Sequence, residues 1–400
     1  MAWNHKENVV AIGVAIQAQQ GVFVAPGAND LIGVSNVGNT RDPITTDDPT
    51  QTGTIWKPAR IVIGKTGTVN FNFPMRGPGG ASPPAANAWP MGRIMRSGGY
   101  TEIINATPIA GTLQSGSTTS QLALAAAASA VDGLYVGAPI QMVPIGSGAI
   151  RGTSLITAYN GATKAASIAD TLASAPSAST AYTIPAYLSY VLGTLGTAPP
   201  FLSISVWRDK RRYDYVDCRM QSITKDIPVG NEYNTGFPSI EVTMKGTPIA
   251  SPQDTTPALP SSILGVPVPA AKAGKFTFDR VPLGHGGLSW QTGYEVGAPS
   301  NQNQEAGIDG HEIMSGDRTL NLDLNQMDVV DFDFETRENA QTIMPVQSLW
   351  GGLAGNRFGF LAPGVVMNPL NPGARNGFVS LTGDTFPVAV DKSAALTIWW

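Results

Sequence analysis

The chain has 400 residues, of which 42% are hydrophobic and only 14% are charged, and its formal net charge is −4. The charged fraction is about half that of an ordinary soluble domain, and the apolar content suffices for packed cores, so disorder driven by charge and polarity is excluded. The 45 glycines and 31 prolines suit short strands joined by turns, which predicts an all-β protein.

The N-terminal region holds the chain's closest approach to a signal peptide. The apolar run Val9–Ile16 lacks a basic segment before it and a small-residue cleavage site after it, so we expect a strand or arm of a protein that is not exported. No run reaches the roughly 18 apolar residues that would span a bilayer. The slightly acidic balance offers no general attraction to polyphosphate.

Two further elements are predicted before residue 106. Polar and apolar residues alternate from Val69 to Phe73, which is typical of a half-buried strand with Asn70 and Asn72 on its polar face. The segment Ala85–Arg96 has a single β-branched residue and is followed by Gly98-Gly99, which predicts a short helix with a glycine stop.

Charged residues become rare between residues 106 and 198. Such a stretch can be a disordered linker, but short apolar runs bounded by turn residues favour a small folded β domain. The runs that predict strands are Gln121–Leu124, Ile140–Val143, Ser154–Tyr159 and Tyr182–Ile184.

The segment after residue 198 returns to a charged surface. Phe201–Val206 and Tyr213–Val216, joined by a polar turn, predict a hairpin, and Ile240–Met244 predicts a further strand. The Pro/Thr/Ser-rich stretch at 251–261 predicts a linker.

The last third repeats the pattern of the first. Thr319–Leu324 matches Thr68–Phe73 position for position, with Asn321 and Asp323 where the first copy has Asn70 and Asn72. Each copy is then expected to contain a short helix that ends in a double glycine, Gly98-Gly99 or Gly351-Gly352. Each is also expected to close with an alternating strand, Ile240–Met244 or Leu396–Trp400. The shared order favours an internal duplication.

Four groups of residues resemble functional motifs. Ala59–Thr66 has the spacing of a phosphate-binding loop, but its Arg-Ile-Val-Ile centre and the strand that follows exclude the required glycine-rich turn and helix. His5, His285 and His311 are expected to be exposed loop residues, and Cys218 a buried thiol rather than a nucleophile. Asp331–Glu335 could hold paired carboxylates for acid/base work or a cation, but its alternation more simply predicts a strand with a negative face.

The chain resembles the tail tube (major tail) proteins of long-tailed bacteriophages. The resemblance is carried by the hairpin Ser203–Met220, the closing strand Ile240–Thr247, the short helix at Pro90–Gly99 and the segment Gly351–Pro363. The insertion Ala110–Ile184 is similar to small β insertions in phage tail proteins.

The resemblance implies an all-β fold with two tail-tube-type β-sandwich or barrel domains and short helices. One domain would span 1–105 with 199–250 and the other 262–400, with a linker at 251–261 and a small inserted β domain at 106–198 on the outer surface. The chains would close into rings, either three chains forming a pseudo-hexamer or six, and the rings would stack into a tube. No enzymatic activity, cofactor, metal or membrane contact is implied.

The same resemblance implies a role in the virion, reached by assembly in the bacterial host cytoplasm. The tube would contact the tape measure, tail terminator and distal tail proteins, and double-stranded DNA would pass through without specific binding. About 24 strands would give a barrel roughly 48 Å across, wide enough for a duplex of roughly 20 Å. The candidate lumen-facing residues, neutral or negative so that phosphate is not gripped, are Asn70, Asn72, Asn321, Asp323, Asp331, Asp333 and Glu335.

Two other functions fit the composition. A capsid decoration or tail-tip protein would share it without needing a duplication. A carbohydrate-active β-sandwich or β-helix enzyme would need carboxylates that face each other across a cleft with aromatic platforms, which the spacing of the eight tryptophans does not indicate.

Overall fold

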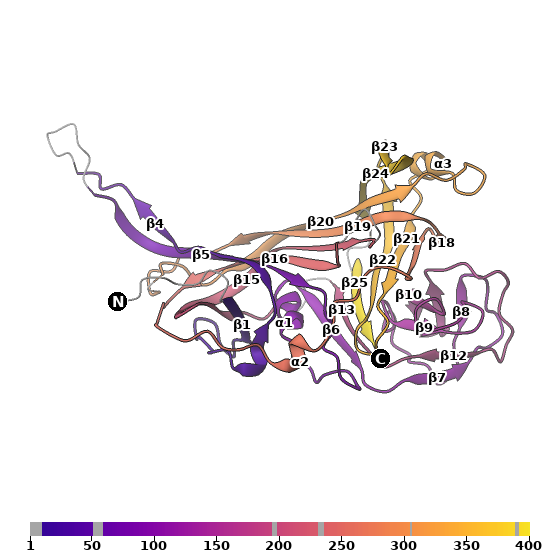
Figure 1. Ribbon diagram of the computed structural model, residues 1–400, viewed down its shortest axis with the longest axis horizontal. Coiled ribbons are helices and arrows are strands. Elements are labelled where there is room, and N and C mark those ends of the chain that lie inside the picture. Colours follow the sequence, from indigo (N-terminus) through magenta and orange to yellow (C-terminus); the bar gives the residue numbers. More distant parts are fainter. Residues whose placement is uncertain (1–9, 51–58, 194–197, 231–235, 305, 389–391) are drawn as a thin grey trace.

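The computed structural model describes residues 10–50, 59–193, 198–230, 236–304, 306–388 and 392–400. It is almost entirely β, with neighbouring strands antiparallel and only short helical segments, so the all-β prediction is confirmed. The described residues form two sheets, one of 19 strands and one of six. The larger sheet is long and curled, and a hairpin arm projects from one end of it (Figure 1).

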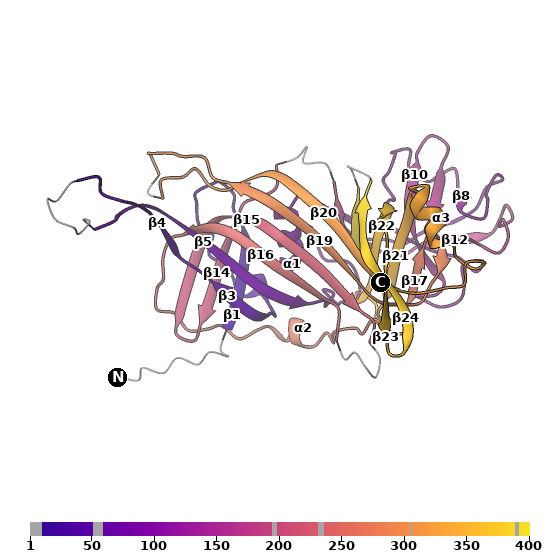
Figure 2. The same cartoon turned by 90° about the horizontal axis from the view of Figure 1, so that it is seen from above.

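The longest strands lie side by side in one layer, which we call the long sheet (Figure 2). In spatial order it contains β3 (Ser35–Asn39) and β4 (Asp42–Thr46), which share one side of β5 (Ile61–Pro74), then β16 (Ser239–Pro248), β15 (Arg211–Pro228), β19 (His285–Gly297), β20 (Glu312–Asn325), β24 (Phe378–Pro387) and β23 (Asn371–Arg375). β15 and β19 therefore join the two predicted tube-like units within one sheet.

The remaining strands of the 19-stranded sheet fold over the apolar side of the long sheet. One group continues from β15 through β14 (Leu202–Arg208), β1 (Val10–Ile16) and β2 (Leu31–Ile32). The other continues from β24 through β22 (Arg357–Met367), with β25 (Ala394–Trp399), β13 (Tyr187–Leu192) and β6 (Tyr100–Asn105) on one side and β21 (Met344–Trp350), β17 (Lys275–Phe278) and β18 (Val281–Pro282) on the other.

The largest hydrophobic core of the described residues lies between these layers. It contains Phe71 and Ile204 from the first predicted unit and Trp290, Phe360 and Ile398 from the second. At most about 2 to 3 kcal/mol is gained for each such side chain fully buried. Because the core runs through both units without a break, the two units stabilise each other.

The insertion forms the six-stranded sheet, here called the inserted module (residues 109–184). Its strands, in spatial order, are β7 (Ile109–Thr112), β12 (Ala181–Ile184), β9 (Pro139–Gln141), β10 (Thr153–Asn160), β11 (Ala165–Ile168) and β8 (Gln121–Ala123). Four of them match the strands predicted from the apolar runs. The strand β13, which also lies within 106–198, belongs to the larger sheet.

The inserted module packs against the body through a shared apolar core and a polar network. Leu349, Leu361 and Trp399 of the body are buried in one cluster with the module's own side chains. Beside them, the Gln347 side chain accepts a hydrogen bond from the Leu155 N–H (3.0 Å) and donates to Asp170 (2.9 Å). Lys275 pairs with the same Asp170 carboxylate at 2.8 Å. The module is thus fixed to the body rather than tethered to it.

The helical segments are α1 (Pro90–Ser97), α2 (Ser261–Leu264), α3 (Phe334–Asn339) and the 3-10 turn η1 (Ala28–Asp30). The predicted first helix is present as α1, which begins at Pro90 rather than Ala85, and Gly98 is its C-cap residue. The second helix is not where the double glycine placed it, since Gly351-Gly352 follows strand β21. The helix of the second copy is α3, which overlaps the end of the strand predicted at Asp331–Glu335.

The order strand, helix, strand recurs as β5-α1-β6 and β20-α3-β21, in agreement with the repeated pattern. The closing strands correspond differently from the prediction. β16 pairs with β5 just as β24 pairs with β20, whereas β25 lies in the second layer between β13 and β22. β24 was overlooked because Gly383 and Asp384 interrupt its apolar pattern.

Candidate functional site

The outward face of the long sheet gathers polar side chains from strands that are far apart in sequence. Residues directly opposite each other on neighbouring antiparallel strands project to the same face. The cross-strand rows on this polar face are Asn70, Thr243, Ser222, Gly293 and Asp317; Asn72, Glu241, Thr224, Gln291 and Thr319; and Asp226, Ser289, Asn321 and Asp384.

The opposite face of the same strands enters the core. One row there contains Phe73, Ile240, Lys225, Trp290 and Leu320, all buried. Lys225 is the one ionisable side chain in this row. Its Nζ donates to the Tyr100 hydroxyl at 2.6 Å, and burial lowers the pKa of Lys225. The strict alternation explains why one face is polar, because each strand must place every second residue in the core.

Four of the seven candidate lumen residues lie together on this polar face. They are Asn70, Asn72, Asn321 and Asp323, with Asp323 opposite Thr382. Asp323 is also paired with Arg375 of β23, so its charge is compensated locally. The repeated sequence pattern in β5 and β20 therefore predicted residues that lie on one continuous surface.

Asp331, Asp333 and Glu335 do not belong to a strand, which corrects that prediction. Asp333 is the N-cap of α3, where its Oδ1 accepts from the Thr336 N–H at 3.0 Å, and hydrogen bonds from Thr336 lower the pKa of its carboxyl. Phe332 is buried, with its ring centroid 4.6 Å from that of Phe334. The alternation of Asp and Phe suggested a strand, but Asp333 and Thr336 form a helix N-cap instead. The rings of Phe332 and Phe334 can pack together without an extended backbone.

The polar face carries more negative than positive side chains. Its carboxylates are Asp226, Glu241, Glu295, Asp317, Asp323 and Asp384, and its basic residues within the described strands are Lys245 and Arg375. Sequence reasoning missed Asp226, Glu241 and Asp384. The signal was present for Glu241 in the alternation Ile240-Glu241-Val242, whereas Asp226 and Asp384 needed the strand register.

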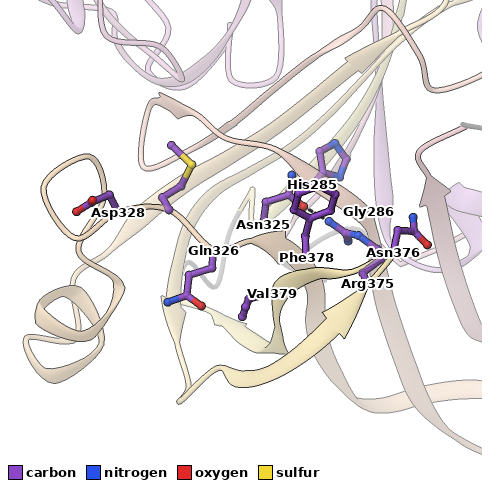
Figure 3. Close-up of a pocket in the computed structure, with 10 residues that line it drawn as sticks. His285, Gly286, Asn325, Gln326, Asp328, Arg375, Asn376, Phe378 and Val379 are labelled. Carbon is purple, nitrogen blue, oxygen red and sulfur yellow. Dashed lines mark hydrogen bonds between the residues drawn. The ribbon is translucent and has the colours of Figure 1, made fainter.

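A hollow of about 1130 Å³ lies at one end of the long sheet, between the β23–β24 hairpin and the segment after β20 (Figure 3). Arg375 and His285 lie at one side of it and Asp328 at the other. His285 packs its ring 4.0 Å from that of Phe276. Among the residues that the structure describes, no group of three or more His, Cys, Asp or Glu side chains could hold a metal ion.

Neither described histidine is an exposed loop residue, which corrects that expectation: His311 is buried and His285 is half-buried at the start of β19. His5 lies outside the described residues. His311 is completely buried, and burial together with nearby Lys245 and Arg219 lowers its pKa to about 4. Burial likewise lowers the pKa of His285 to about 4. Cys218 is buried, as predicted, and burial raises the pKa of its thiol.

We expect acidification to destabilise the fold through His311. The unfolded chain, with a histidine pKa near 6.5, binds a proton between about pH 6.5 and pH 4 that the folded chain does not, so the free energy of unfolding falls as the pH decreases. From about pH 7 to pH 5 the expected loss is about 1 to 2 kcal/mol. Denaturant unfolding of the parent and of His311→Gln at both pH values measures it; an equal loss in both would contradict the assignment.

The loop-like motif at Ala59–Thr66 forms no phosphate site, because Gly64, Lys65 and Thr66 all lie within strand β5. No helix in the described part of the chain is long and apolar enough to cross a membrane. In comparisons with known proteins, no protein-family model and no curated protein matched this chain.

Proposed function

We propose that this chain is a structural protein that closes into rings and stacks into the tail tube of a long-tailed bacteriophage, through which double-stranded DNA passes. The observation that carries the proposal is the polar face of the long sheet, on which acidic side chains outnumber basic ones and which is backed by an apolar core. Facing a channel, such a surface repels phosphate and offers few cations to hold it.

The edges of the long sheet support ring closure. In the described part of the chain, β3 and β4 pair only with β5, and β23 pairs only with β24, so both ends of the sheet present unpaired backbone groups. Exposed edges of this kind are templates for pairing with another chain. β23 of one copy would pair with the β3–β4 edge of the next, as β15 pairs with β19 inside one copy.

The number of strands favours three chains in a ring. With β3 and β4 counted as one position, the long sheet has eight strand positions. Three copies would supply the roughly 24 strands of a barrel wide enough for duplex DNA. The two halves of each chain, with their repeated order of strand, helix and strand, would then stand in for two subunits of a six-fold ring.

The proposal places the protein in the virion, in contact with itself and with the tape measure, tail terminator and distal tail proteins. Electron microscopy of the concentrated purified protein tests it, with uniform hollow rods as the expected result. Six chains in a ring would refute the trimer. Compact particles that never polymerise would favour a decoration or tail-tip protein instead.

A single N–H on β23 provides the sharper test. Asn376 and Gly377 have φ values of 51° and 83°, which form a two-residue turn with Arg375 opposite Phe378. Hydrogen-bonded and non-hydrogen-bonded pairs alternate from that turn, so the N–H of Ala374 points away from β24 to the open edge. Pro372, two residues earlier, has the same orientation and lacks that donor.

We expect Ala374→Pro to abolish tube formation and leave the monomer folded, because the substitution removes only a donor that β24 does not use. Ala374→Ser, which keeps the N–H, is the matched control. Thermal unfolding checks the monomer, and sedimentation with electron microscopy checks assembly. Normal tubes from Ala374→Pro would show that β23 does not pair with the neighbouring chain.

A further inference from the structure

A second, smaller pocket is lined in part by residues of α1 and α2. Both helices lie on one side of the long sheet (Figure 1). Its volume is about 330 Å³, near the lower end of the range of about 300 to 1,000 Å³ for small-molecule sites. Its walls are mostly apolar and include Leu31, Phe73, Trp89, Met91 and Ile263. Apolar walls of this kind suit a hydrocarbon body.

One cationic side chain, Arg76, lines this pocket. Its Nη1 donates a long 3.4 Å hydrogen bond to the Ile263 carbonyl, and its Nε is buried without a partner within the described part of the chain. No Asp or Glu is among the described lining residues. A guanidinium left without an anion in an apolar wall is costly, so an anionic group entering the pocket would gain more there than at a hydrated surface.

The start of α1 adds to the positive potential. Pro90 and Met91, its first residues, line the pocket, and neither a side-chain cap nor an acidic residue occupies the first turn. The N–H groups of a first helical turn have no partner within the helix and carry partial positive charge. The nearby carboxylate of Asp30 is already engaged, 2.6 Å from Arg93.

We propose that this pocket binds a small carboxylic acid with an apolar body, of the medium-chain fatty acid type. Its carboxylate would lie on Arg76, and its chain against Phe73, Trp89 and Met91. A monoanion matches the single guanidinium, whose planar fork can donate two hydrogen bonds to a carboxylate. The pocket has room for about ten to fifteen non-hydrogen atoms, which excludes long-chain lipids.

Calorimetric titration of the full chain with decanoate, decanol and N-acetylleucine tests the proposal. Decanoate should bind with a dissociation constant of about 0.1 to 1 mM, and at least about tenfold more tightly than decanol, which lacks the carboxylate. The third probe imitates the end of a protein chain. If it binds more tightly than decanoate, a protein terminus rather than a fatty acid is the ligand, and the proposed class is wrong.

Variants assign the site. Arg76→Met keeps the aliphatic stem and should weaken decanoate binding about tenfold while leaving decanol unchanged. Arg151→Met, at an exposed position on the inserted module, should leave both unchanged. Ile263→Trp, which fills the pocket from α2, should block both ligands and serves if Arg76→Met fails to fold. The absence of saturable decanoate binding to the parent, or equal binding to the parent and to folded Arg76→Met or Ile263→Trp, would overturn the proposal.

Discussion

If the chain forms the proposed tube, the triple variant Asp226→Lys, Glu241→Lys and Asp384→Lys is expected to assemble normally and to retain duplex DNA that parent tubes would release. The three side chains lie in exposed positions on the polar face, on β15, β16 and β24. Their replacement changes the charge by six units per chain without touching the core, so monomer stability should stay within about 0.5 kcal/mol.

Salt dependence identifies the cause. If the new lysines contact six or more phosphates, binding of duplex DNA to the tubes should fall about 10³-fold or more between about 50 and 200 mM salt. DNA ejection from virions carrying the variant should slow at low ionic strength and recover as salt is added. The measurements are DNA retention by purified tubes and the ejection rate across a salt series.

The control places the same charge change elsewhere. Asp331→Lys, Glu335→Lys and Glu338→Lys alter residues in and just before α3, including two that the sequence alone placed in the lumen. This variant should behave like the parent. Equal DNA retention by both triple variants would mean that the polar face of the long sheet does not line the channel.

Deletion of Gly111–Ile184 with a short Gly/Ser bridge is expected to yield an aggregating or strongly destabilised chain. An outer ornament would be dispensable, but this module covers Leu349, Leu361 and Trp399. Exposing three such side chains costs about 5 kcal/mol or more, a large part of the stability of an ordinary domain. The deletion would also leave Gln347 and Lys275 without their module partners.

A second deletion variant distinguishes the effect of exposing apolar side chains from the effect of losing the module. With Leu349→Thr, Leu361→Thr and Trp399→Thr added, the shortened chain should regain solubility, because the aggregating patch is gone. Expression, sedimentation and thermal unfolding compare the two chains. A simple deletion that is soluble and melts at the parent temperature would show that the contacts between module and body contribute little.

The sequence predicted those elements whose pattern is set by burial on one side. Alternation in β5 and β20 could be recognised because every second residue enters the core, and the module strands because turn residues bound them. The strand prediction for Asp331–Glu335 was wrong because a helix N-cap and two packed aromatic rings produce the same alternation of polar and apolar residues. The prediction that His311 is exposed was wrong because the segments that bury it, including β15, are distant in sequence.

The candidate site was also predicted only in part from the sequence. Asn70, Asn72, Asn321 and Asp323 could be identified from repetition, but the rows that join them run through β15, β16 and β19, whose register depends on bulges. The pocket at Arg76 could not be predicted at all. It is assembled from η1, β2, β5, α1 and α2, which no local pattern connects.

The position of β25 has a consequence for how the chain folds. This strand follows all the others described here in sequence, yet it fills the gap between β13 and β22, and its six residues are buried. Its pairing with β13 closes a loop of about 200 residues, a long-range contact of the kind that makes folding slow. During translation, the second layer would remain incomplete until β25 has left the ribosome. Nascent chains that lack β25 would therefore leave the facing edges of β13 and β22 unpaired.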